Sequence, residues 1–164
     1  IDVVLFGAGH VGRALVQILA TLPCRVIWVD ARESEFPADV PDNVTVVATD
    51  MPEDEVAAAP RDAYFLVMTH SHPLDQMLAE AILRRGEFAY FGLIGSMSKR
   101  RQFERRMAQR GIAEASFNRM TCPIGVAGIT GKEPSTIALA VAAQLLQVKE
   151  AHAASRPAEW EKQG

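Results

Sequence analysis

The chain has 164 residues, of which 49% are hydrophobic and 23% charged, and its formal net charge is -3. This length suits one domain with a sizeable core, and the slight acidic balance disfavours a nucleic-acid partner, which needs a basic excess. No apolar run approaches the roughly 18 residues of a membrane span, so we expect no membrane association. The two cysteines, Cys24 and Cys122, are too few for a disulfide framework, and we expect a reduced, cytoplasmic setting.

The predicted elements alternate between strands and helices along the chain. The sequence begins at Ile1 with no initiator methionine, so we expect it to be part of a longer protein. Short apolar runs without alternation predict strands covered on both faces. They lie at Val3–Phe6, Arg25–Asp30, Val44–Ala48, Ala63–Met68, Ala89–Leu93 and about Arg119–Cys122. Helical periodicity lies between them, at Val11–Leu22, Glu53–Ala59 (the weakest), Pro73–Arg85, Lys99–Arg110 and Pro134–Glu150.

This alternation of strand and helix predicts the fold class. Right-handed crossovers between successive strands give a mostly parallel sheet with helices on both faces. We therefore expect a doubly wound, Rossmann-like α/β domain over residues 1–150. A polar C-terminal tail is expected over residues 151–164.

The glycine-rich turn after the first predicted strand, GAGHVG, has the spacing of a dinucleotide-binding loop. Gly7 would allow the tight turn, Gly9 the approach of a diphosphate, and Gly12 the close packing of helix on strand. Free N–H groups at the start of the helix would face the anion. Asp30, which ends the second strand, stands where an acidic residue accepts from ribose hydroxyls and favours NAD, although Arg32 nearby could accommodate the 2′-phosphate of NADP. A tight turn that binds no nucleotide is the alternative.

Histidines lie in two of the loops that follow strands. His10 is part of the glycine loop, and His70 and His72 follow the fourth strand in VMTHSHPLD. In the strand order 3-2-1-4-5-6, strands one and four are neighbours whose connections leave in opposite directions, and ligands bind in the crevice between them. We therefore expect these two loops to face each other. Metal ligation, polar contact with a ligand, and helix capping with Ser71 and Asp75 all remain open.

Two further loops carry candidate ligand-binding residues. In FGLIGSMSKRR, Gly95 makes a flexible turn, Ser96 offers a cap, and Lys99 and Arg100 open a helix. Cations in a first helical turn oppose the helix dipole, so a bound anion would explain them; a solvated basic face is the alternative. In TCPIGVAGITGKEPST, glycines let the backbone approach a ligand. Cys122 is either a thiol near that ligand or a small buried residue.

Taken together, GAGHVG, VMTHSHPLD, YFGLIGSMSKRRQF and CPIGVAGITGKEPSTIALAVAAQLL resemble the XdhC/CoxI family, in order and with similar spacing. The closer resemblance is to the C-terminal Rossmann domain of its xanthine dehydrogenase accessory factors. It implies a molybdenum-cofactor chaperone that holds the cofactor during sulfuration and helps insert it into xanthine dehydrogenase. It also implies a cysteine desulfurase as partner and a homodimer.

The resemblance gives the four loops an expected ligand, the molybdenum cofactor (molybdopterin). Its terminal phosphate suits helix N-termini and cations, and we interpret the histidines as contacts to the pterin or to molybdenum oxo groups. The residues expected to bind it are Gly7, Gly9, His10, Gly12, Asp30, His70, His72, Gly95, Ser96, Lys99, Arg100 and Cys122. The rival hypotheses are an NAD(P)-dependent oxidoreductase, which usually needs a second domain to close over the hydride acceptor, and a nucleotide-binding regulatory domain.

Overall fold

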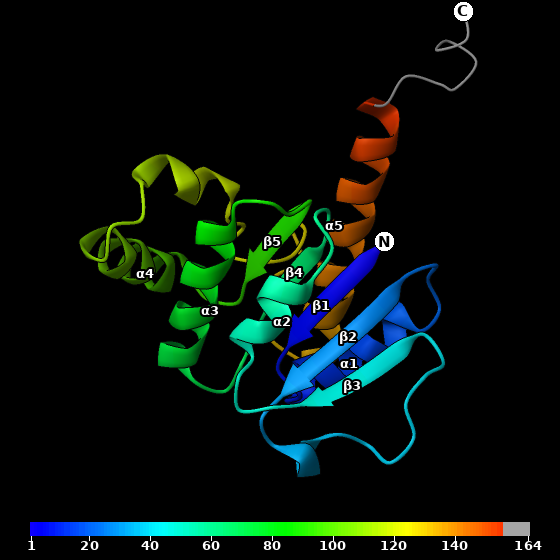
Figure 1. The fold of residues 1–164 in the computed structure, drawn as a ribbon. Helices are drawn as coiled ribbons and strands as arrows, with labels where there is room; N and C mark the ends of the chain where they lie inside the picture. Colours follow the sequence, from blue (N-terminus) through cyan, green and yellow to red (C-terminus); the bar gives the residue numbers. More distant parts are fainter. Residues whose placement is uncertain (156–164) are drawn as a thin grey trace, which may run out of the picture.

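Five parallel strands form the sheet at the centre of the molecule (Figure 1). The computed structural model describes residues 1–155 of the chain. The strands are β1 (Asp2–Phe6), β2 (Arg25–Asp30), β3 (Val44–Ala48), β4 (Tyr64–Val67) and β5 (Tyr90–Leu93). They lie in the order β3-β2-β1-β4-β5 and pair in parallel. This confirms the predicted doubly wound, Rossmann-like fold.

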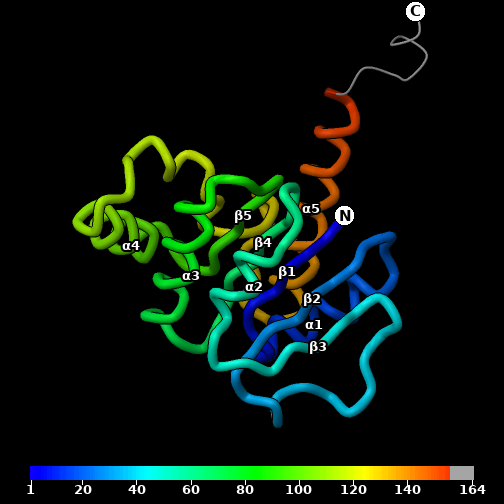
Figure 2. Tube along the Cα trace, in the orientation of Figure 1, coloured from blue at the N-terminus to red at the C-terminus, as the bar shows by residue number. Residues whose placement is uncertain are grey.

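Helices cover both faces of this sheet. They are α1 (His10–Leu19), α2 (Glu53–Ala58), α3 (His72–Arg85), α4 (Met97–Gln109) and α5 (Pro134–Ser155), with 3-10 helices η1 (Glu33–Glu35) and η2 (Glu114–Arg119). Helices α1 and α5 pack side by side on one face, and α2, α3 and α4 lie on the other (Figures 1 and 2). The connections therefore wind onto both faces, as right-handed crossovers in opposite directions require.

Successive residues of β1 show how the sheet is buried. Val3 and Leu5 pack in the layer of α1 and α5, whereas Val4 and Phe6 pack in the layer of α2, α3 and α4. Each of the four is at most 3% exposed. A strand buried on both faces needs apolar residues at every position, which explains why its sequence shows no polar alternation.

Helix α3 illustrates how local signals set helix ends. Ser71 caps its amino end, and the Ser71 hydroxyl accepts from the N–H of Leu74 at 3.4 Å. Pro73 lies in the first turn, where its missing N–H leaves no hydrogen bond unmade. Gly86 ends the helix with a φ of 74°, in the left-handed region that a C-terminal glycine adopts without strain.

The predicted sixth strand, Arg119–Cys122, is wrong in extent. Thr121 alone forms a bridge, to Gly92 of β5, so this segment continues the sheet order without forming a strand. The preceding residues are wound into η2. Pro123, which follows, has no N–H to donate to a longer ladder.

Helix α5 is longer than its sequence pattern predicts. It continues past Glu150 to Ser155 and projects beyond the sheet (Figure 1). The predicted polar tail therefore begins inside a helix, and its remaining residues, 156–164, lie outside the described residues. Neither α5 nor any other described helix combines the length and the apolar character that crossing a membrane requires.

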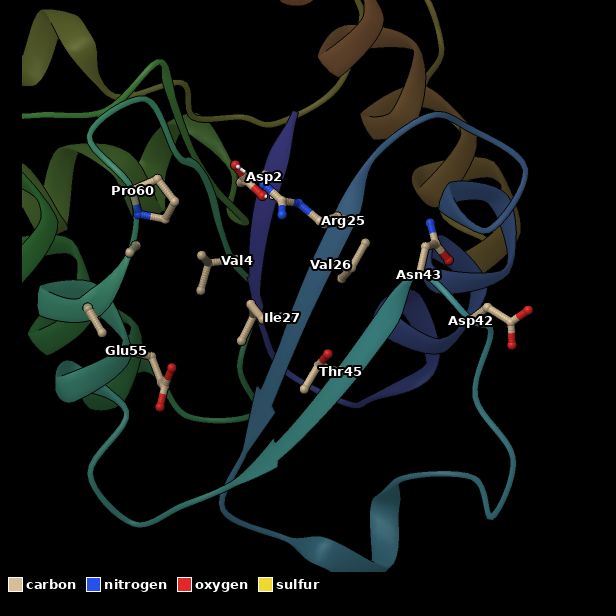
Figure 3. Close-up of a pocket in the computed structure, with 12 residues that line it drawn as sticks. Asp2, Val4, Arg25, Val26, Ile27, Asp42, Asn43, Thr45, Glu55 and Pro60 are labelled. Carbon is tan, nitrogen blue, oxygen red and sulfur yellow. Dashed lines mark hydrogen bonds and ion pairs between the residues drawn. The ribbon is translucent and has the colours of Figure 1, made fainter.

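One face of the sheet is only partly covered near the amino ends of the strands. Helix α2 has six residues, and a groove of about 420 Å³ opens between it and β3 (Figure 3). Val4, Ile27 and Thr45, in register on neighbouring strands, line this groove. The ion pair between Asp2 and Arg25, 2.9 Å long, lines it as well. The groove lies away from the carboxyl ends of the strands, where the glycine loop is found.

Candidate functional site

The loops that follow the carboxyl ends of the strands form one rim. Gly7 follows β1 and packs directly on the end of β4, because a Cβ at Gly7 would lie 2.2 Å from the backbone oxygen of Met68. The loop after β5 adjoins the loop after the Thr121 bridge, since Cys122 Sγ lies 3.6 Å from the oxygen of Gly95. With β4 and β5 paired to each other, the four predicted loops lie along one edge of the sheet.

Asp30, at the end of β2, braces the glycine loop. Its side chain is 3% exposed. Asp30 Oδ2 accepts from the N–H of Ala8 at 2.8 Å and from Arg32 Nη2 at 3.0 Å. Asp30 Oδ1 accepts from the backbone N–H and Nε of Arg32, at 2.8 and 3.0 Å. A carboxylate offers about four lone-pair sites, so the chain itself saturates Asp30, and a ribose diol would first have to displace Arg32.

These donors also set the charge of Asp30. Burial alone would raise the pKa of Asp30, but the hydrogen bonds from Arg32 and Ala8 outweigh it and hold the pKa below its ordinary value. The carboxylate is therefore ionised at neutral pH. Because its pKa is lowered by folding, the stability it contributes is present above about pH 3.9 and is lost as the pH falls through the folded-state pKa.

The amino end of α1 offers hydrogen-bond donors to an anion. The first N–H groups of an α-helix have no intrahelical acceptor, and Gly9, which precedes α1, makes no side-chain cap to them. A Cβ at Gly9 would meet nothing within 4 Å, so no other residue fills the space beside Gly9. His10 is exposed at the first helical position. Together with the helix dipole, these donors suit a phosphate.

The two histidines after β4 lie against different neighbours. His70 lines a small pocket together with Gly7 and Asp30. His72 begins α3 and lies edge to face with Phe103 of α4, with ring centroids 6.4 Å apart. Both histidines are exposed. Within residues 1–155, no three His, Cys, Asp or Glu side chains are grouped so as to hold a metal ion. The two histidines thus belong to separate parts of the rim.

Asp75 holds the histidine loop in place. The residue is 1% exposed, and its Oδ1 accepts from the backbone N–H and the hydroxyl of Thr69, at 2.9 and 2.6 Å. Burial raises the pKa of Asp75, and the hydrogen bonds from Thr69 and the nearby His72 and His70 offset this only in part. The sequence indicated a role for Asp75 at the helix start, but the contact with Thr69 depends on how the loop turns back.

Arg100, predicted to meet an anion, points into the domain. Its Nε pairs with Glu104 Oε1 at 2.7 Å, and its Nη1 and Nη2 donate to the carbonyl oxygens of Cys122 and Phe117, at 2.8 and 2.9 Å. Arg100 thereby ties α4 to η2 and to the loop after the bridge. Lys99 remains half-buried at the start of α4, where its N–H donates to the Ser96 hydroxyl at 3.2 Å.

Cys122 is a core residue. It is 3% exposed and packs in the same apolar layer as Phe103 and Met107. Burial raises the pKa of Cys122 to about 11, so its side chain is a neutral thiol at neutral pH. Of the two roles left open by the sequence, this geometry favours the small buried residue.

We expect Arg100→Ala to lower the free energy of unfolding by about 1–2 kcal/mol, because the carbonyls of Phe117 in η2 and Cys122 in the loop, together with Glu104, lose a charged donor. The neighbouring Arg101 is exposed, so Arg101→Ala is a matched control with an expected change within about 0.5 kcal/mol. Urea unfolding followed by circular dichroism measures both. Equal losses in the two variants would show that Arg100 does not brace the loop.

A pocket of about 90 Å³ opens beside the glycine loop. Gly7, Asp30 and His70, which were predicted to form the site, line it. Its other wall is formed by Thr49 and Asp50, in the loop after β3, which are not among the residues predicted from the sequence. These two residues carry no motif. The one signal available is the position of their loop at the carboxyl end of a strand that neighbours β2.

The chain is similar in sequence and in structure to known proteins. The family model described as the XdhC Rossmann domain matches residues 3–145. The uncharacterized protein YqeB of Escherichia coli (strain K12) is 33% identical over 152 residues, which cover 89% of this chain and 27% of YqeB. The crystal structure of a xanthine dehydrogenase (BH1974) from Bacillus halodurans is similar with a TM-score of 0.78 and 24% identity, covering 95% of this chain and 45% of that one.

The matched region includes every loop of the rim, from the glycine loop to the loop after the bridge. The chain spans about a quarter of the length of YqeB and less than half of the BH1974 chain. With residues 3–145 matched, the chain belongs to the XdhC Rossmann domain family.

Proposed function

We propose that this domain binds molybdenum cofactor, holds it during sulfuration and helps insert it into xanthine dehydrogenase. Membership of the XdhC family supports a role in the maturation of molybdenum enzymes. The observation that carries the proposal is that a helix amino end and a pocket lie next to each other on the rim. The open amino end of α1 and a pocket with a polar edge adjoin the same residue, Gly7.

The donor and acceptor groups of the rim fit this cargo. Molybdopterin ends in a phosphate, which needs N–H donors and positive potential, and the start of α1 supplies both. Its pterin is flat and polar at the edges, and the pocket offers apolar walls with carboxylate and imidazole groups. Cys122 is a buried, neutral thiol, so we assign it a packing role instead of the expected contact with the cofactor.

The partners follow from the same proposal. Sulfuration requires a sulfur donor, so a cysteine desulfurase is one partner, and the recipient molybdoenzyme, xanthine dehydrogenase, is the other. We also propose that the protein acts as a homodimer in the cytoplasm. The two free cysteines, both buried, suit a reducing compartment.

An NAD(P)-dependent oxidoreductase or a nucleotide-binding regulatory domain is supported less well. The glycine loop favours a dinucleotide, but that hypothesis depends on Asp30 accepting from a ribose. Asp30 already accepts four N–H groups from Ala8 and Arg32. Tight NADH binding with turnover of a hydride acceptor would reverse this preference.

Reconstitution of cofactor-free xanthine dehydrogenase tests the proposed function. We expect the full-length protein, supplied with sulfurated molybdenum cofactor, to increase recovered activity severalfold over cofactor alone. Serum albumin at the same concentration is the control for nonspecific protection of the cofactor. Equal recovery with and without the protein would contradict the chaperone role.

A further inference from the structure

The pocket beside the glycine loop has an apolar interior. Phe6, Val29 and Leu78 line it and are each at most 1% exposed. Ala31, Pro52 and Leu74 also belong to its apolar lining. Its volume of about 90 Å³ is below the roughly 300–1,000 Å³ of pockets that enclose a whole ligand. The pocket therefore has the size and surface to receive a flat ring at one end of a larger molecule.

The two carboxylates that line this pocket differ in whether they already accept hydrogen bonds from the protein. Asp30 is saturated by Ala8 and Arg32. Asp50, in the loop between β3 and α2, is exposed and has no hydrogen-bond or ion-pair partner among residues 1–155. Because an ionised carboxylate only accepts hydrogen bonds, Asp50 selects for a ring with N–H donors at its edge.

We propose that this pocket binds the aminopyrimidinone ring of a pterin, with the Asp50 carboxylate accepting from its amino group and its adjacent ring N–H. Two neighbouring donors match the two oxygens of a carboxylate in a bidentate pair. The apolar lining then contacts the face of the ring. Adenine fits less well, because the ring nitrogen beside its amino group is an acceptor and would face the negative charge of Asp50.

The pocket adjoins the amino end of α1, where we propose that the phosphate binds. Gly7 lines the pocket, and only Ala8 and Gly9 separate it from the first residue of α1. A ligand whose ring enters the pocket can thus extend over the glycine loop and place a phosphate at the open N–H groups. This inference rests on the proposed function and specifies which end of the cofactor binds where.

Fluorescence titration of 6-hydroxymethylpterin phosphate with the 164-residue chain tests the assignment. We expect Asp50→Asn to weaken binding by about 10- to 100-fold, since a charged pair of hydrogen bonds is reduced to one neutral acceptor. Asp42→Asn removes another exposed carboxylate, at the amino ends of the strands, and should leave the dissociation constant within twofold of the wild-type value. This pattern would support the assignment.

Three other results would overturn it. The first is an unchanged dissociation constant in Asp50→Asn, and the second is no pterin binding to the wild-type chain. The third is stronger binding of GMP or AMP than of the pterin phosphate, which would make this a nucleotide pocket; GMP matters because guanine has the same pair of donors. None of these decides the proposed function, because reconstitution of the cofactor-free enzyme measures that separately.

Discussion

Gly7→Ala is expected to lower the free energy of unfolding by about 3 kcal/mol or more. A Cβ at this position would lie 2.2 Å from the backbone oxygen of Met68, and backbone atoms at the end of β4 cannot move aside as a flexible side chain can. Gly7 also has a φ of 122°, which a side chain disfavours. Overpacking and backbone strain therefore add. Urea unfolding followed by circular dichroism measures the loss.

Gly9→Ala is the matched control in the same loop. Gly9 has a φ of −77°, and a Cβ there would meet nothing within 4 Å. We expect its free energy of unfolding to stay within about 1 kcal/mol of the wild-type value. The added methyl group would, however, stand in front of the open N–H groups of α1, so binding of the pterin phosphate should weaken. Equal destabilisation by the two substitutions would contradict the steric account of Gly7.

The glycine loop could be predicted from the sequence because its spacing follows from local sterics. A Cβ at Gly12 would lie 2.3 Å from the oxygen of Gly7, so the helix can approach the loop this closely only at a glycine. The sequence also places Asp30 correctly at the end of β2. It does not show that the Arg32 side chain turns back onto Asp30, because that contact depends on a turn with no distinctive motif.

The role of Arg100 could not be predicted from the sequence either. Two basic residues after a capping serine predict an anion site, because cations are unfavourable in a first helical turn. The structure offers Arg100 other partners, the carbonyls of Phe117 and Cys122, which come from a segment many residues away. The loop containing Asp50 was not predicted for a related reason. Its residues line the pocket because β3 lies beside β2 in the sheet, and the strand order is known only from the fold.

Asp75→Ala is expected to lower the free energy of unfolding by about 2–3 kcal/mol at neutral pH. The substitution removes the acceptor of the Thr69 N–H, while the Thr69 hydroxyl can still donate to the carbonyl oxygen of Ser71 at 3.0 Å. Leaving the partly buried N–H unpaired carries its desolvation penalty. Asp75→Asn keeps one acceptor oxygen and should lose less. If both substitutions left stability unchanged, the Asp75 contact would not be what orders the histidine loop.

The pH dependence of Asp75→Asn separates charge from hydrogen bonding. Because folding raises the pKa of Asp75, its ionisation favours the unfolded chain. The part of its contribution to stability that depends on protonation is therefore fully present below about pH 3.9 and is lost as the pH rises through the folded-state pKa, whereas the hydrogen bond from the Thr69 N–H remains. The amide that replaces this carboxyl group in the variant does not titrate, so the wild-type protein should lose stability relative to Asp75→Asn over that rise. Asp30 has the opposite pH dependence, but it is present in both proteins, so its effect cancels in the difference between them.

Urea unfolding at a series of pH values measures this difference in the free energy of unfolding. A difference that is constant with pH would mean that the Asp75 carboxylate is solvated like a surface group.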